Sequence, residues 1–226
     1  SNPEEAFHFS VKAFDLADQL QTPVIVLSDL DIGMNDWMIK DLKWDKNFNP
    51  DHGKVLGVEE LEVMEKFHRY QDKDGDGIPY RTIPGTHPKG SYFTRGSGHN
   101  KLGLYTEDAQ EYQELVDRLL VKWETAKNLV PKPIIDFLDS NVYAILCVGS
   151  CDDAIREARD TLTKKGLAFN YLRITAFPFA KEVEEFLKEH EKIFVVEQNR
   201  DGQLRKLVAM ETGIHLEKLD SIRMYD

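Results

Sequence analysis

The segment VYAILCVGSCDDAIREARDTLTKKGLAFNYLRIT, residues 142–175, decides the fold class of this chain. An apolar run ends at the turn Gly149-Ser150, an amphipathic stretch follows and closes at Gly166, and a second apolar run begins at Ala168. Apolar and amphipathic stretches that alternate in this way, with turn residues at each junction, are typical of β-α-β units. Such units join parallel strands through right-handed crossovers.

The same alternation continues to the C-terminus. Residues 180–190 (AKEVEEFLKEH) predict a second helix, 192–199 (KIFVVEQN) a third strand, 202–213 (GQLRKLVAMETG) a third helix and 219–226 (LDSIRMYD) a fourth strand. We therefore predict an α/β fold with an open parallel sheet over residues 141–226.

A long amphipathic helix is predicted upstream, over residues 107–130. Its apolar residues recur at steps of three and four, Thr106 is the expected N-cap, and Pro131 and Pro133 forbid continuation. The stripe consists of Tyr112, Leu115, Val116, Leu119, Leu120, Trp123 and Ala126.

The N-terminal 30 residues predict one helix and one strand. Residues 3–20 carry Pro3 and two acids in the first turn, with Phe7, Val11 and Phe14 on one stripe. Residues 24–27 (VIVL) form an apolar run that predicts a strand buried on both faces of a parallel sheet. A single helix and strand cannot build that sheet, so we expect residues 1–30 to be the remnant of a domain that lies mostly upstream.

Residues 31–140 predict a connecting region between these parts. Residues 30–105 have no sustained period apart from a short helix expected near 59–70. So long an irregular stretch is usually functional or disordered.

Charge and composition exclude several classes of partner. The net charge of -11 argues against nucleic acid or an anionic membrane, which bind basic surfaces. No run of about 18 apolar residues could span a bilayer. Cys147 and Cys151 have a spacing that fits neither a redox nor a zinc motif, so we expect reduced cysteines in a cytoplasmic protein.

The stretch DKDGDG, residues 72–77, begins as a calcium loop begins. Asp72, Asp74, Asp76 and Gly77 match its positions one, three, five and six, but position twelve is Ile83 where a bidentate Glu is required. This excludes an EF-hand. A looser divalent-ion site and a solvated turn built by Asp and Gly both remain open.

A basic loop over residues 77–106 follows. It contains no Asp or Glu, although 40 of the 226 residues are acidic, and it holds six of the 14 glycines. Guanidinium groups and closely approaching backbone N–H groups bind small anions. The loop therefore contacts either an anionic ligand or an acidic neighbouring subunit, and the sequence leaves both open. Its charged and titratable residues are Arg81, His87, Lys89, Arg95, His99 and Lys101.

Two further turns offer polar groups at the carboxyl ends of predicted strands. Gly149-Ser150 could cradle a phosphate, but acids at 152 and 153 favour a capping role instead. Residues 197–199 lie where open α/β sheets bind ligands, although turn and interface hydrogen bonds are favoured there. No catalytic triad is recognisable, and no catalytic residue is predicted.

Four blocks, taken together, resemble one enzyme family. They are PEEAFHFSVKAFDLADQLQTPVIVLSD (3–29), GIPYRTIPGTHPKGSYFTRGSGHN (77–100), TEDAQEYQELVDRLLVKWETAK (106–127) and VVEQNRDGQL (195–204). They are similar to the C-terminal part of the α subunit of 2-oxoacid:ferredoxin oxidoreductases, with the 2-oxoglutarate type as the nearest match. The resemblance covers essentially the whole chain.

The resemblance implies an activity and a domain plan. Such enzymes use thiamine diphosphate, Mg²⁺, iron–sulfur clusters and coenzyme A to convert a 2-oxo acid to an acyl-CoA while reducing ferredoxin. Residues 1–30 would be the last helix and strand of the pyrimidine-binding domain, and 141–226 a transketolase C-terminal-like domain. Residues 31–140 would lie near a subunit contact and help to shape the substrate pocket.

The resemblance also implies site residues and partners. Arg81, Thr82, His87, Arg95 and His99 would contact substrate, while the cofactors would be held outside these residues, so the chain alone should bind none and be inactive. The partners would be a thiamine-binding β subunit, a γ subunit or fused γ domain, and ferredoxin. The alternative is a non-catalytic assembly module whose basic loop docks a partner subunit.

Overall fold

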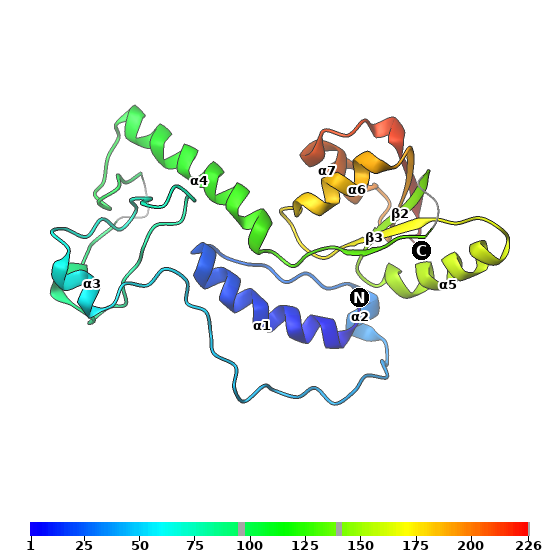
Figure 1. Cartoon of the computed structure of the whole chain (residues 1–226), viewed down its shortest axis with the longest axis horizontal. Helices are drawn as coiled ribbons and strands as arrows, with labels where there is room; N and C mark the ends of the chain where they lie inside the picture. Colours follow the sequence, from blue (N-terminus) through cyan, green and yellow to red (C-terminus); the bar gives the residue numbers. More distant parts are fainter. Residues whose placement is uncertain (95–97, 139–141, 226) are drawn as a thin grey trace. The chain divides into compact units, whose positions relative to one another are not determined.

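The computed structural model describes residues 1–94, 98–138 and 142–225, and the chain divides into two compact units (Figure 1). One unit comprises residues 1–10, 26–44 and 130–226, and the other comprises 11–25 and 45–129. Both units are therefore built from segments that are distant in the sequence.

The first unit contains a five-stranded sheet in the order β1-β3-β2-β4-β5. The strands are β1 (Ile134–Asp136), β2 (Tyr143–Val148), β3 (Asn170–Ile174), β4 (Lys192–Glu197) and β5 (Leu219–Arg223). β2 to β5 are parallel, as predicted, whereas β1 pairs antiparallel with β3 at the edge. β1 was not predicted, because three residues directly after two prolines give too short a pattern.

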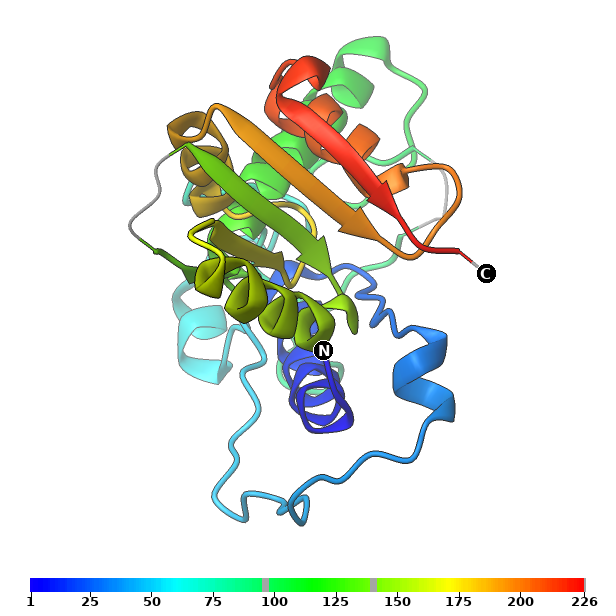
Figure 2. The same cartoon turned by 90° about the vertical axis from the view of Figure 1, so that its right-hand side faces the viewer.

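Helices cover both faces of this sheet (Figure 2). Side chains of α6 (Lys181–Glu189) and α7 (Gln203–Thr212) pack with Leu146, Leu172 and Val195 on one face. Side chains of α5 (Cys151–Lys164) pack with Ile145 and Tyr171 on the other. Neighbouring strand residues point to opposite faces, so continuous apolar strands bury both. The α/β fold with a mostly parallel sheet is confirmed. A short 3-10 helix, η2 (Leu216–Lys218), precedes β5.

The predicted N-terminal helix is confirmed as α1 (Pro3–Leu20), but its apolar stripe is not. Its buried residues are Leu16 and Leu20, which join the core of the second unit, whereas Phe14 is 79% exposed. A short helix, α2 (Leu30–Met34), follows with Asp29 as its N-cap.

The strand predicted at 24–27 is wrong. These residues form no strand, and Ile25 and Leu27 are 79% and 88% exposed. A strand requires a neighbouring strand to accept and donate its backbone hydrogen bonds. Among the described residues none fills that role for this run.

The second unit contains α3 (Val58–Val63), the 3-10 helix η1 (Pro88–Gly90) and α4 (Ala109–Leu129) between irregular segments. Its two apolar clusters centre on Leu20, Ile78 and Ala126, and on Leu61 and Phe67. The long helix is confirmed. α3 is shorter than the helix expected at 59–70. It ends at Val63, and Met64 already has extended backbone.

Two details of α4 differ from the prediction. Its N-cap is Asp108, whose carboxylate accepts hydrogen bonds from the backbone N–H groups of Gln110 and Glu111 at 3.0 and 2.9 Å, whereas Thr106 accepts only from Asp108. Of the predicted stripe, the structure buries Ala126 alone. In the described part of the chain, no helix combines the length and hydropathy that a membrane crossing requires.

Candidate functional site

The basic loop begins at the turn of residues 72–77, which is built by a carboxylate. Asp72 accepts hydrogen bonds from the backbone N–H groups of Asp74, Gly75 and Gly77 at 3.2, 2.9 and 2.7 Å. These bonds close the turn as an Asx-type motif does. The carboxylate of Asp72 thus serves the backbone of the turn.

Lys54 provides the cation of this turn. Its Nζ lies 2.6 Å from Asp74 Oδ2 and 2.7 Å from Asp76 Oδ2, and it also donates to the carbonyl of Ile78 at 3.1 Å. Burial lowers the pKa of Lys54, but these hydrogen bonds outweigh it and leave the pKa raised. Among the described residues, no group of three His, Cys, Asp or Glu side chains could hold a metal ion. Of the weak metal candidates Asp72, Asp74 and Asp76, the ammonium of Lys54 pairs with the last two, and Asp72 accepts the backbone hydrogen bonds of the turn.

The turn is also the place where the loop meets α4. A Cβ added to Gly77 would lie 2.2 Å from the backbone N of Lys122, and its φ of +78° belongs to the left-handed region. Arg118 Nη1 donates to the carbonyl of Gly77 at 2.8 Å, and Thr125 Oγ1 donates to that of Asp76 at 2.7 Å. Only glycine permits this approach.

Arg81 lies at the centre of a small polar cluster. Its Nη2 is 2.9 Å from Asp18 Oδ1 and donates to the carbonyl of His52 at 3.0 Å. Asp18 Oδ2 is also 2.7 Å from Nδ1 of His52. The hydrogen bond with His52 is the largest cause that lowers the pKa of Asp18, and Arg81 adds to it. Nε of Arg81 is buried and has no hydrogen-bond partner.

Thr82 and His87 shape the turn that follows. Thr82 Oγ1 donates to the carbonyl of Gly90 at 2.8 Å, and His87 Nδ1 accepts from the backbone N–H of Lys89 at 3.2 Å as the N-cap of η1. Lys89 Nζ donates to the carbonyls of Glu62 and Met64 at the end of α3. The structure thus brings Thr82 and His87 to the same turn.

His99 lies in a separate cation–aromatic cluster. Its ring stacks on Tyr70 with centroids 3.8 Å apart. Arg69 lies over Tyr70 and Tyr92, at 4.8 and 5.7 Å from their centroids, and its Nε donates to the Tyr92 hydroxyl at 3.2 Å. Nη1 of Arg69 is buried without a hydrogen-bond partner. Arg95, the remaining predicted residue, lies outside the described residues.

Sequence reasoning missed Arg69 and Lys54. Arg69 belongs to a His-Arg-Tyr run, and a guanidinium between aromatic residues is a signal for stacking. Lys54 carries no such local signal, because its partners lie 20 and 22 residues further along the chain.

At the carboxyl edge of the sheet, the chain's own carboxylates bind the helix starts. Asp29 accepts from the backbone N–H of Ser150 at 2.9 Å, beside Gly149. Glu197, which is buried, accepts from the N–H groups of Leu204 and Arg205 at 2.8 and 3.3 Å. Internal carboxylates therefore occupy the amides that an external phosphate would use.

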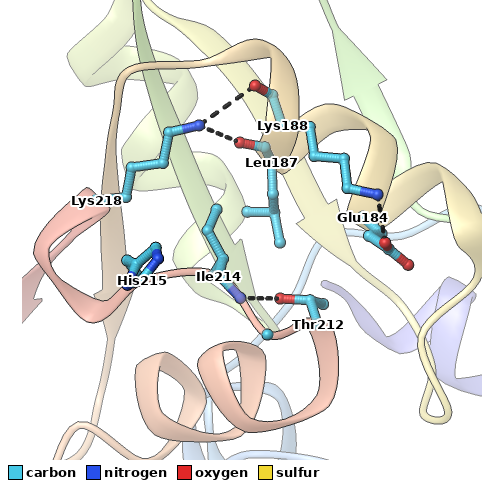
Figure 3. A pocket seen from close by; sticks show the side chains of 8 residues that line it. Glu184, Leu187, Lys188, Thr212, Ile214, His215 and Lys218 are labelled. Atoms are coloured by element: carbon cyan, nitrogen blue, oxygen red, sulfur yellow. Dashed lines mark hydrogen bonds and ion pairs between the residues drawn. The ribbon is translucent and has the colours of Figure 1, made fainter.

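The first unit also carries a depression of about 330 Å³ between α6 and the segment that follows α7 (Figure 3). Lys218 Nζ donates there to the carbonyls of Leu187 and Lys188, and Lys188 pairs with Glu184 at 2.5 Å. Its two lysines are thus bound to the chain, and none of the predicted site residues lines it.

Comparison with known proteins finds relatives of one kind. No protein-family model matches the chain. The 2-oxoacid:ferredoxin oxidoreductase 2 subunit alpha of Aeropyrum pernix is 28% identical over 216 residues, which is 93% of this chain and 32% of that protein. The 2-oxoglutarate synthase subunit KorA of Methanocaldococcus jannaschii is 24% identical over 205 residues, 88% of this chain and 51% of KorA.

A solved structure shares the fold. It is the 2-oxoglutarate:ferredoxin oxidoreductase from Magnetococcus marinus with 2-oxoglutarate, coenzyme A and succinyl-CoA bound, with a TM-score of 0.78 and 22% identity. The match covers 94% of this chain and 36% of that one. The chain thus spans about a third to a half of the length of its relatives. The predicted resemblance is confirmed: over nearly its whole length, this chain is similar to part of the α subunit of 2-oxoacid:ferredoxin oxidoreductases.

Proposed function

We propose that this chain forms part of the α subunit of a 2-oxoacid:ferredoxin oxidoreductase that acts on 2-oxoglutarate. The reaction is oxidative decarboxylation to the acyl-CoA, with the electrons passed to ferredoxin. One observation carries this proposal: the similarity to α subunits extends over 93% of the chain and so includes both compact units. A single shared domain would give similarity over only one of the two units.

The contribution of this chain is structural, together with one wall of the substrate pocket. Residues 141–226 act as the transketolase C-terminal-like domain, residues 1–30 complete a pyrimidine-binding domain, and residues 31–140 carry the pocket loop. Thiamine diphosphate, Mg²⁺, the iron–sulfur cluster and coenzyme A are bound by the whole complex. Its other members are a β subunit, a γ subunit or domain, and ferredoxin.

Arg81 is the residue of the loop with the clearest capacity to bind an anion. Its guanidinium is fixed by Asp18 and by the carbonyl of His52, and the side chain is still 26% exposed. A fixed, partly exposed guanidinium binds a carboxylate with little loss of side-chain entropy. We assign to it a contact with the distal carboxylate that distinguishes 2-oxoglutarate from pyruvate.

The test is charge reversal in the full complex. Arg81→Glu should raise KM for 2-oxoglutarate by about ten- to hundredfold, the scale of one charge-assisted contact, and KM for pyruvate much less. Lys101→Glu, an exposed change on the same loop, is the matched control. Asp18→Asn removes the partner of Arg81 and keeps the cation, so it should leave the discrimination largely intact. Equal effects of Arg81→Glu on both substrates would refute the assignment.

The alternative function is that of an assembly module, and the internal bonds of the loop favour it. Lys89 and the hydroxyl of Thr82 are both used to hold neighbouring backbone carbonyls, as is one Nη of Arg81. In that case Arg81→Glu should reduce co-purification of the subunits, while KM stays unchanged in complexes that survive. The two functions therefore separate in one set of measurements.

A further inference from the structure

Three basic side chains of the second unit gather beside the turn of residues 72–77. Arg118 and Lys122 lie one helical turn apart on the face of α4 that meets Gly77. The third is Arg69, which precedes the turn in the sequence and whose charge acts on both of the others. All three residues are partly buried and partly exposed.

None of these three cations forms an ion pair with a carboxylate of the described residues. Their hydrogen bonds go to two backbone carbonyls and a tyrosine hydroxyl, at 2.8, 3.5 and 3.2 Å from Arg118, Lys122 and Arg69 respectively. Such acceptors leave the positive charges uncompensated. By contrast, Lys54 and Arg81 in the same unit each meet a carboxylate.

The uncompensated charge acts within the cluster itself. Burial lowers the pKa of Lys122, and the charges of Arg118 and Arg69 lower it further. Burial also lowers the pKa of Arg118, where Asp72 opposes the shift and Arg69 adds to it. Asp72 hydrogen-bonds to none of the three, and both of its carboxylate oxygens already accept backbone N–H groups of the turn. The cluster therefore lacks negative charge.

We propose that Arg69, Arg118 and Lys122 form a binding site for a phosphate group. A guanidinium has five N–H donors and an ammonium has three, so each side chain keeps donors beyond the bond that it makes within the chain. A phosphate carries up to two negative charges and several acceptor oxygens on one compact group, whereas a carboxylate carries one charge on two oxygens. Three cations beside a single carboxylate therefore match a phosphate better.

This inference does not rest on the proposed function, because it uses none of the residues predicted to contact the 2-oxo acid. The site also differs in kind from Arg81, whose charge is already met by Asp18. Failure of one proposal would therefore leave the other standing.

Isothermal titration calorimetry with inorganic phosphate, on the purified chain in a chloride buffer of constant ionic strength, tests the site. The wild type should bind one phosphate per chain. Lys122→Gln and Arg69→Gln should each weaken binding at least about tenfold, the scale of one charge-assisted hydrogen bond. Lys127→Gln is the matched control and should bind as the wild type does. It makes the same charge change on the same helix, at a lysine that pairs with Glu124.

Thermal melting gives an independent measurement. Phosphate should raise the melting temperature of the wild type and of Lys127→Gln, but not that of Lys122→Gln. Without phosphate and at low ionic strength, Lys122→Gln should melt above the wild type, because it removes a partly buried charge that its neighbours repel. A lysine that served only to hold the carbonyl of Gln21 would give a lower melting temperature instead, and that result would overturn the proposal.

Two further outcomes would also overturn it. One is the absence of saturable phosphate binding by the wild type, and the other is equal weakening by Lys122→Gln and Lys127→Gln, which would mean binding to the general charge of the chain. Succinate as a second titrant tests the class of ligand, and tighter binding of succinate than of phosphate would refute the phosphate assignment. Far-UV circular dichroism establishes that the variants are folded. With substitutions at two separate elements, the test still holds if one of them unfolds the chain.

Discussion

At the scale of single residues, Gly77 explains what the calcium-like stretch does. The sequence motif suggested a cation site, yet the structure uses the turn to bring backbone against backbone at α4. Asp72 closes the turn, Gly77 approaches the helix, and Thr125 and Arg118 hold the two together. The glycine is therefore needed for packing as well as for its positive φ.

Substitution of two glycines in this turn separates the two requirements. Gly75 has a φ of +77° and open space around its Cβ position, whereas Gly77 has a φ of +78° and meets α4. Gly75→Ala should cost about 1 kcal/mol of unfolding free energy, the ordinary penalty of the left-handed region. Gly77→Ala should cost several times as much, because α4 must move away. Urea unfolding of both variants measures the difference, and equal losses would show that α4 does not pack there.

A second residue-scale feature is the buried ion pair that binds α1 to the sheet. Arg173, on β3, donates from Nη1 and Nη2 to the two carboxylate oxygens of Glu5 at 2.7 Å each. Burial raises the pKa of Glu5, but the interactions with Arg173 and with the N-terminal ammonium of Ser1 together outweigh it, and the net pKa is lowered. Asp152 lies on the other side of Arg173 and accepts a hydrogen bond from Tyr171 at 2.6 Å.

This lowered pKa predicts a pH-dependent contribution to stability. A carboxyl whose folded pKa is depressed stabilises the fold above its unfolded pKa, about 4.3, and loses that contribution as the pH falls through the folded value. Glu5→Gln should therefore cost about 2 kcal/mol near neutral pH, and the difference from wild type should shrink below about pH 4. Glu4→Gln, at an exposed neighbour, is the control. A difference that does not change with pH would exclude the ion pair as its source.

At the scale of elements, the sequence predicted the parallel sheet well because each strand and helix carries its own periodicity. β2, β4, α6 and α7 begin and end within two residues of the prediction. The predictions that failed concern features that depend on neighbouring elements of the structure. The pattern of α4 located an apolar stripe without showing what covers it, and the run at 24–27 has a strand's composition without a strand beside it. The same limit explains Lys54, which pairs with the 72–77 turn from outside the local pattern.

Lys54 gives a prediction about this turn as an element. Lys54→Met leaves the carboxylates of Asp74 and Asp76 without their cation, so the melting temperature should fall, and added Ca²⁺ should partly restore it. Lys73→Met, on the same turn but exposed, should change little. The melting temperature of the wild type should respond neither to Ca²⁺ nor to a chelator. A fall on chelation would mean that the three aspartates bind a metal after all.

At the scale of the whole molecule, apolar segments differ in how completely the described chain covers them. The sheet of the first unit is covered on both faces by its helices. The segment at 24–27 is not covered in this way, because Ile25, Val26 and Leu27 are exposed side by side. Monomeric proteins rarely leave such runs uncovered, and we propose that chain beyond the described residues covers this one. The proposed domain plan supplies it, because residues 1–30 would complete a sheet that lies mostly upstream.

Hydrogen exchange distinguishes this plan from a free surface segment. In the chain alone, no backbone N–H of residues 24–27 donates a hydrogen bond to another described residue, so these amides should exchange rapidly. In the full complex they should exchange more slowly, because the upstream chain would then cover the run. The amides of β2 are the internal control, since they are paired on both sides within the chain and should be slow in both samples. Rapid exchange at 24–27 in an active, fully assembled complex would contradict the assignment of residues 1–30 to a neighbouring domain.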